Sequence, residues 1–253
     1  MTNTDKELQT YLESFLTPHR IQRLKEVLAQ RTRYIICVLE DLYDPRNGSA
    51  VIRHCDALGI QEIHAIEHKN RFRTDHQVDM GTAQWLDIQT SRSWQGLAKS
   101  VKERRKAKDH SLEAHSGTIQ ALTALKQRGY RIAAAVPQAE NAETPESINL
   151  SESPLALVFG SEKHGISAEV RTLADSFISI PMSGFIDSFN ISASAAIILY
   201  TLVNRLKKEN LPWQLNSEDA ENTYFRWVKA SAPHVDKLTA HYQSVLADGV
   251  RNR

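Results

Sequence analysis

The segment LVFGSEKHGIS, residues 157–167, joins an apolar run to two glycines, a carboxylate and a serine. Gly160, Gly165 and Ser167 fit the phosphate-loop pattern G-x-x-x-x-G-K-[ST], but Ile166 stands where that pattern has its lysine. The lysine meets the β- and γ-phosphates of a bound nucleotide, so its absence argues against a nucleotide-binding hydrolase. Glycines at a strand end still let backbone approach a ligand closely, and this ligand must be of another kind.

Two further segments place polar side chains after short apolar runs, EDLYDPRNGSAVIRHCDALG and IPMSGFIDSFNISASAA. In the first, Asn47 follows a proline and precedes a helical pattern that stops at Gly59, which predicts that Asn47 caps that helix. In the second, Ser188 and Asn190 are good caps for the apolar helix that follows. The three segments lack a G-x-G-x-x-G fingerprint, a metal-ligand spacing and a G-x-S-x-G elbow, which disfavours dehydrogenases, metalloenzymes and serine hydrolases.

Short apolar runs alternate with helical patterns along the chain, which predicts an α/β fold with a parallel sheet covered on both faces. Strands are expected at 34–39, 60–66, 82–88, 131–136, 155–159 and 177–180. Helices are expected at 18–33, 47–58, 92–128 with a break near 110–117, 167–174 and 190–207, with one or two more in 211–253. In such sheets ligands collect at the carboxyl ends of the strands, so the three polar segments should meet there.

The bulk composition excludes several classes of protein. Hydrophobic residues at 41% and charged residues at 24% are typical of a soluble globular protein. No apolar run approaches the roughly 20 residues that a membrane span needs, and MTNTDKELQT does not resemble a secretory signal. Cys37 and Cys55 lack C-x-x-C spacing, which predicts buried, reduced thiols in a cytoplasmic protein.

The positive charge is concentrated in two places, although the net charge is only +1. Residues 18–33 hold five basic side chains and one acidic one, and residues 92–108 hold seven and one. Such patches on a neutral body suit a protein that meets a polyanion at chosen places. Two solvated helix faces would give the same pattern, and both interpretations stay open at this point.

At the three polar segments the sequence resembles the SpoU group of the SPOUT RNA methyltransferases, most closely the TrmH-type tRNA guanosine 2′-O-methyltransferases. Residues 47–53 match the family's N-x-x-A-x-x-R motif, and residues 159–165 match FG-x-E-x-x-G. Residues 180–193 match I-P-M-x-G-x-x-x-S-L-N-V-S-x, with Phe189 and Ile191 in place of Leu and Val. The order and spacing of the three motifs make the resemblance specific, and it extends over most of the chain.

The resemblance implies a methyltransferase domain over 34–207, with its part at about 131–207 threaded into a deep trefoil knot, a rare topology. It implies N- and C-terminal helical extensions over 1–33 and 208–253, the first of which binds tRNA. It also implies S-adenosylmethionine as the cofactor and no metal ion. The cofactor would lie against the loops that carry Val136, Gly160, Gly165, Ile180, Met182, Ser188 and Phe189.

The resemblance further implies a cytoplasmic homodimer that methylates the ribose 2′-hydroxyl of the D-loop guanosine at tRNA position 18. The catalytic residues would be Arg53, Asn47, Glu162, Ser188 and Asn190, and tRNA would contact Arg20, Arg23 and Arg31. A 23S rRNA 2′-O-methyltransferase of the same family, or a non-catalytic RNA-binding module on the same fold, are the alternatives.

The role of Arg53 has two readings. The family assigns activation of the hydroxyl to this arginine, but a guanidinium pKa above about 12 makes a neutral arginine scarce. A charged Arg53 could instead bind the phosphate beside the target ribose and stabilise the oxyanion. In either case its side chain is expected to lean back toward the start of its helix, with Glu162 and Asn190 closing the other side.

Overall fold

The structure of the chain is a computed structural model, and it describes residues 2–92, 116–139 and 141–251. The chain divides into two compact units, one of Met1–Thr32 with Gln214–Arg253 and one of Arg33–Trp213. Within the described ranges, no helix is long and apolar enough to cross a membrane. The basic cluster at 92–108 and the break expected near 110–117 lie largely outside the described residues.

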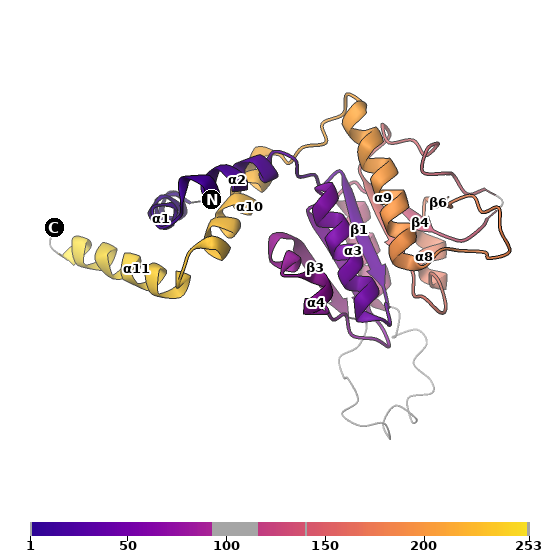
Figure 1. The fold of residues 1–253 in the computed structure, drawn as a ribbon, viewed down its shortest axis with the longest axis horizontal. Helices are drawn as coiled ribbons and strands as arrows, with labels where there is room; N and C mark the ends of the chain where they lie inside the picture. Colours follow the sequence, from indigo (N-terminus) through magenta and orange to yellow (C-terminus); the bar gives the residue numbers. More distant parts are fainter. Residues whose placement is uncertain (1, 93–115, 140, 252–253) are drawn as a thin grey trace, which may run out of the picture. The chain divides into compact units, whose positions relative to one another are not determined.

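The unit of Arg33–Trp213 is built on a sheet of six described strands whose neighbouring pairs are all parallel (Figure 1). The strand order is β3-β2-β1-β5-β4-β6. Strands β2 and β3 lie on one side of β1, and the later strands β5, β4 and β6 lie on the other, so the direction in which strands are added reverses at the boundary between β1 and β5. The strands are β1 (Ile35–Glu40), β2 (Glu62–Glu67), β3 (Asp87–Arg92), β4 (Arg131–Ala135), β5 (Leu155–Phe159) and β6 (Ser176–Ile178). The predicted parallel α/β sheet is confirmed, and such a reversal is where open sheets bind ligands.

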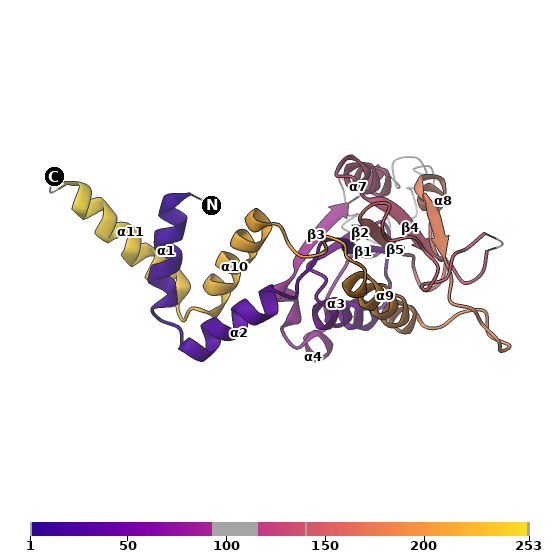
Figure 2. The same cartoon turned by 90° about the horizontal axis from the view of Figure 1, so that it is seen from above.

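Helices cover both faces of this sheet (Figure 2). One face carries α3 (Pro45–Leu58) and α9 (Ile191–Lys208), and the other carries α7 (Ser116–Gln127) and α8 (Ala168–Leu173). Successive side chains of β1 point to opposite faces of the sheet and so belong to two separate hydrophobic cores. Cys37 packs toward α3 and α9, while Val38 packs toward α7 and α8. The apolar pattern of the strands therefore fixes both helix layers.

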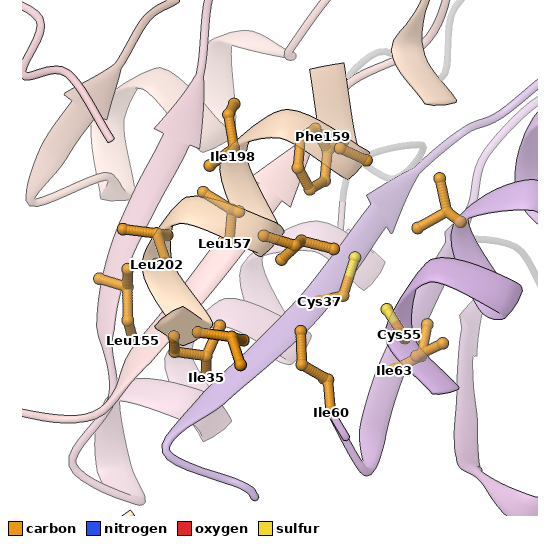
Figure 3. Close-up of a cluster of buried hydrophobic side chains, with 14 of the residues drawn as sticks. Ile35, Cys37, Cys55, Ile60, Ile63, Leu155, Leu157, Phe159, Ile198 and Leu202 are labelled. Atoms are coloured by element: carbon orange, nitrogen blue, oxygen red, sulfur yellow. The ribbon is translucent and has the colours of Figure 1, made fainter. Parts of the chain in front are cut away.

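The core under α3 and α9 is dense and apolar (Figure 3). Leu155, Leu157 and Phe159 of β5 meet Ile198 and Leu202 of α9, and all are almost completely buried. Burying one such side chain contributes about 1.5–3 kcal/mol. Cys37 and Cys55 lie in the same cluster as free, buried thiols, as predicted.

Three element boundaries differ clearly from the sequence-based expectation, the first being that the helix expected at 18–33 ends at Leu28. The run at 82–88 forms a 3-10 turn, η1 (Thr82–Trp85), and β3 begins only at Asp87, so the expected strand is displaced along the chain. The N-cap of helix α3 is Asp44, three residues before the expected cap Asn47, and the side chain of Asp44 accepts from the N–H of Arg46 at 2.9 Å. Pro45 suits the first helical position, where no N–H is needed. The prediction that Asn47 is the N-cap is therefore wrong, and its side chain is free for other contacts.

The unit of the chain ends consists of α1 (Asn3–Glu13), α2 (Pro18–Leu28), α10 (Ser217–Ser231) and α11 (Val235–Arg251). The ring of Tyr11 lies 5.1 Å from that of Tyr242, and Gln214 donates to the carbonyl of Ala29 at 3.2 Å. These contacts join segments from opposite ends of the chain, so the N- and C-terminal helices pack as one body.

Candidate active site

The carboxyl ends of β4, β5 and β6 surround a cavity of about 600 Å³. Its walls come from the segments that follow these strands and from the start of α9. The seven positions predicted to hold the cofactor all line it: Val136, Gly160, Gly165, Ile180, Met182, Ser188 and Phe189. The structure thus brings together residues that are spread over more than fifty positions of the sequence.

The loop after β5 is a tight hairpin that depends on its two glycines. Ser161 and Gly165 exchange backbone hydrogen bonds of 2.9 Å in both directions, and Gly165 has a φ of +65°. A Cβ added at Gly160 would lie 2.2 Å from the carbonyl carbon of Gly165. The glycine at 160 is therefore required by the loop's own closure, whereas the sequence had suggested only a close approach to the ligand. Ile166, which stands in place of a phosphate-loop lysine, is buried in the core.

A chain of hydrogen bonds joins the three sequence motifs beside this cavity. The side-chain amide of Asn190 donates to Oδ1 of Asn47 at 3.2 Å, and Nδ2 of Asn47 donates to Oε1 of Glu162 at 2.8 Å. Asn190 also caps α9 by accepting from the N–H of Ser192 at 2.8 Å, as predicted. Because a carboxylate only accepts, Glu162 fixes which way the amide of Asn47 points, and Asn47 in turn orients Asn190.

Glu162 is anchored to the start of α3. Its carboxylate accepts from the N–H groups of Tyr43 at 3.0 Å and Asp44 at 3.3 Å as well as from Asn47. Burial raises the pKa of Glu162, but the hydrogen bonds from Asn47 and from these two N–H groups outweigh it and lower the pKa below its ordinary value. Glu162 is therefore ionised at neutral pH, with its charge at the positive end of the α3 dipole.

Charged side chains of both signs line the cavity. Asp187 comes from the segment before α9, Lys163 from the hairpin and Arg171 from α8. Sequence reasoning missed Asp187 and Arg171 as well as the two N–H groups that hold Glu162. Asp187 lies within the third motif, so its place there was a usable signal, while a backbone donor leaves no mark in a sequence.

Arg53 does not lie where the sequence had placed it. Its Nη1 donates to the carbonyl of Val78 at 3.1 Å, in α4 (His76–Asp79), and the side chain is exposed. It is absent from the lining of the cavity, and the described hydrogen bonds of Glu162 and Asn190 go to other groups. The expectation that Arg53 faces these two residues is corrected, because α4 packs on α3 and the carbonyl of Val78 accepts a hydrogen bond from the guanidinium.

The three arginines predicted to contact RNA lie in the helical unit and differ in exposure. Arg31 is only 2% exposed and stacks 5.0 Å from the ring centre of Trp227, so its assignment to an RNA surface is corrected. Arg20 donates to Oγ of Ser231 at 3.1 and 3.2 Å. Arg23 is exposed beside Glu26 at 3.7 Å.

The profile of the SpoU rRNA Methylase family matches residues 34–111 and 105–200. The chain belongs to this family. A tRNA (guanosine(18)-2′-O)-methyltransferase of Borreliella burgdorferi is 32% identical over 234 residues, which cover 90% of this chain and 94% of that protein. The protein of the same name from Thermus thermophilus is 31% identical over 235 residues, covering 93% and 97%.

Solved structures give the SpoU-family fold independently. The TrmH/SpoU tRNA modifying enzyme of A. aeolicus superimposes with a TM-score of 0.66 at 25% identity, over 84% of this chain and 96% of that one. The SpoU methyltransferase AviRb of Streptomyces viridochromogenes, solved in complex with AdoMet, matches with a TM-score of 0.50 at 20% identity over 73% and 62%. The second likeness supports the fold alone.

Proposed function

We propose that this SpoU-family protein transfers a methyl group from S-adenosylmethionine to a ribose 2′-hydroxyl of tRNA, at the D-loop guanosine of position 18. The observation that carries the proposal is the cavity at the carboxyl edge of the sheet, with the Asn190–Asn47–Glu162 hydrogen-bond chain beside it. Relatives named for this reaction match nearly the whole chain, which supports the choice of tRNA and of position 18.

The residues of the cavity fit S-adenosylmethionine. A volume of about 600 Å³ falls within the usual range of ligand sites. The methionine part of the cofactor carries an ammonium, a sulfonium and a carboxylate, and the lining offers Asp187 for the cations and Arg171 for the anion. Apolar side chains such as Ile180 and Met182 suit the adenine ring. When bound, the cofactor supplies an electrophilic methyl group.

The hydrogen-bond chain is suited to orienting a ribose. A 2′-hydroxyl is a weak nucleophile, so the enzyme must align it, accept or relay its proton and stabilise the charge that develops on oxygen. Asn47 and Asn190 are held in fixed orientations and can bind the ribose, with the hydroxyl of Ser188 at the cavity wall. In this role Glu162 holds Asn47 rather than the substrate.

Arg53 is proposed to bind a phosphate of the tRNA near the target nucleotide. Its described partner is the neutral carbonyl of Val78, which leaves the positive charge of the guanidinium uncompensated by that contact. An exposed guanidinium in this state attracts a phosphate, which it can hold through two parallel hydrogen bonds. The charged form of Arg53 is the one used in this role.

We further propose that the active enzyme is a homodimer in the cytoplasm. On the surface of α9, Ile197 and Tyr200 are 38% and 61% exposed, and with Ala57 and Leu58 of α3 they line an apolar groove of about 370 Å³. A second copy that covers this groove would remove apolar surface from water. Light scattering at micromolar concentration should give twice the chain mass, and Tyr200→Glu should shift the protein toward the monomer. A monomeric parent protein would overturn the proposal.

A deep trefoil knot over about 131–207 is part of the same proposal. Strand β5 lies between β1 and β4, so the chain crosses back to the middle of the sheet before it forms β6 and α9. Joining the chain ends and then unfolding the protein should leave a knotted circle, which migrates differently on a denaturing gel from an unknotted circle of the same length. A circle that runs as an unknotted one would exclude the knot.

The direct test is a tritium-methyl transfer assay with tRNA and 23S rRNA transcripts and labelled cofactor. Methylation of tRNA alone supports the proposal. Methylation of rRNA alone would assign the alternative substrate, and binding of RNA without transfer to either would indicate a non-catalytic module.

A further inference from the structure

The last residue of β1, Glu40, is a carboxylate that is only 2% exposed. Its Oε2 accepts from the N–H of Ser167 at 2.9 Å, and its Oε1 accepts from the hydroxyls of Ser167 at 2.7 Å and Thr118 at 2.8 Å. The Nε2 of His68 lies 2.8 Å from the Thr118 hydroxyl and 3.3 Å from Oε1. Groups from β1, from the segment after β2, from α7 and from the start of α8 thus meet at one buried carboxylate.

Glu40 is ionised despite its burial. Burial raises its pKa, but the hydrogen bonds from His68, Ser167 and Thr118 outweigh this and lower the pKa below its ordinary value. A buried carboxylate costs several kcal/mol of desolvation, which only a full set of donors offsets. Both oxygens of Glu40 have such donors, so the site is built to hold a charge.

The donors of Glu40 link it to the catalytic hairpin. Ser167 ends the loop that begins at Gly160, and Glu162 in the same loop accepts from Tyr43, Asp44 and Asn47. The loop is therefore fastened twice to the segment 40–47, by Glu162 near its start and by Glu40 at its end. Because the backbone bridge between Ser161 and Gly165 makes the hairpin stiff, a displacement of Ser167 would be carried to Glu162.

We propose that Glu40 is a positioning residue: by holding Ser167 it fixes the hairpin of 160–167, and it thereby places Glu162 and Asn47 beside the cofactor cavity. Its effect on methyl transfer rests on the proposed function, whereas its effect on the hairpin does not.

The experiment compares Glu40→Gln with Glu62→Gln by hydrogen exchange. Gln keeps the shape of Glu40 but replaces one acceptor by a donor that faces the donors of Ser167 and Thr118. Glu62 is a matched control, since it is also a buried, ionised carboxylate but its contacts are to Arg33, Arg128 and His64. In Glu40→Gln the amides of Ser161, Gly165 and Ser167 should exchange about tenfold faster than in the parent, which corresponds to about 1.4 kcal/mol of local opening.

In Glu62→Gln the same amides should exchange within about twofold of the parent, even though the whole protein is less stable. Equal exchange in Glu40→Gln and the parent, or equal loosening in both variants, would overturn the proposal. If Glu40→Gln does not fold, Thr118→Val removes one bond to Glu40 while the cap of α8 by Ser167 stays intact, and it should loosen the same amides by a smaller factor. Unchanged exchange in that variant would then overturn it.

A second readout separates positioning from general stability. With the complete enzyme, calorimetry should show that Glu40→Gln binds S-adenosylhomocysteine about tenfold more weakly, since the hairpin lines the cavity. The single-turnover rate at saturating cofactor and tRNA should fall as well, while affinity for tRNA stays unchanged. A parent protein that does not bind the cofactor product would sink the proposed function but leave the exchange test of Glu40 intact.

Discussion

Two buried carboxylates, Glu40 and Glu62, lie at opposite ends of neighbouring strands of the sheet, and the groups that surround them differ. Glu62 begins β2 and is held by two arginines and a histidine, with Arg128 at 2.6 and 3.0 Å, His64 at 2.6 Å and a close contact to Arg33. Glu40 ends β1 and is held by hydroxyls, a backbone N–H and a histidine. The first set binds neighbouring elements of the scaffold to each other, while the second reaches into a loop of the candidate active site.

This difference separates the two ends of the sheet: the amino ends of the strands contribute to stability, and the carboxyl ends position the loops of the candidate site. Although burial raises the pKa of Glu62, hydrogen bonds from His64 and Arg128 and the charges of Arg128 and Arg33 hold it far below its ordinary value. An ion cluster of this kind is strongly destabilised when one partner is removed. At the carboxyl edge the sheet instead ends in groups that fasten loops, which agrees with the position of the cavity.

The largest expected effect is a loss of stability when Glu62, at the amino ends of the strands, is changed. Glu62→Gln should lower the free energy of unfolding by about 3–5 kcal/mol, because Arg128 would then face a neutral amide and Arg33 would keep Asp87 as its carboxylate partner. Urea denaturation measures this. The control is Lys126→Gln, which breaks a half-exposed pair with Asp175 and should cost less than about 1 kcal/mol. Equal losses in the two variants would mean that the Glu62 cluster is no stronger than a surface pair.

At the carboxyl edge, Gly160→Val should abolish binding of S-adenosylhomocysteine. The added side chain would collide with the backbone of Gly165 and Ile166 and deform the hairpin that lines the cavity. Gly184→Ala is the matched control, since a Cβ there meets nothing within 4 Å. Calorimetry should show a loss of at least about a hundredfold in affinity for the first variant and little change for the second. Normal binding by Gly160→Val would show that the hairpin is not part of the cofactor site.

Arg53 gives an intermediate effect that is confined to catalysis. If its charge meets tRNA phosphate in the transition state, Arg53→Ala should lower the single-turnover rate by roughly a hundredfold, or about 3 kcal/mol. Affinity for the cofactor product should stay the same, because Arg53 does not line the cavity. Arg53→Lys keeps the charge without the planar fork, so an equally large loss there would point to bidentate contact. A rate within a few-fold of the parent in Arg53→Ala would exclude this role.

The smallest expected effect distinguishes two arginines of the helical unit. Arg23→Ala should lower the slope of log affinity for tRNA against log salt by about one unit if the exposed side chain meets a phosphate. Arg31→Ala should leave that slope unchanged and lower thermal stability, because Arg31 is stacked on Trp227. An unchanged slope in Arg23→Ala would show that Arg23 does not contact a tRNA phosphate and that this surface of α2 only faces solvent.

The sequence carried the local features of this structure and missed those that depend on distant partners. The apolar runs predicted five strands nearly as they are, and Asn190 was recognised as a cap because its partner Ser192 lies two residues away. The start of α3 was misplaced, since Asp44 and Asn47 are both good caps and only the contact of Asn47 with Glu162 decides between them. Asn47 and Glu162 lie 115 positions apart in the sequence.

The same limit explains the errors on charged residues. Arg31 reads as part of a basic surface, but a tryptophan far along the chain covers it. Glu40 gave no signal of its own, because its donors Thr118 and Ser167 come from elements that meet it only in the folded protein. Spacing in a sequence predicts which residues share an element, and the packing of elements decides which charges are buried.

The central claim is that the cavity and its hydrogen-bond chain serve methylation of the 2′-hydroxyl of guanosine 18 in tRNA. The most direct measurement is a single-turnover transfer of labelled methyl groups to two synthetic tRNAs, identical except that one carries 2′-deoxyguanosine at position 18. The account predicts stoichiometric labelling of the ribose form and none of the deoxy form, with both binding equally well. Equal labelling of the two tRNAs would contradict it, because the methyl group would then have gone to another atom.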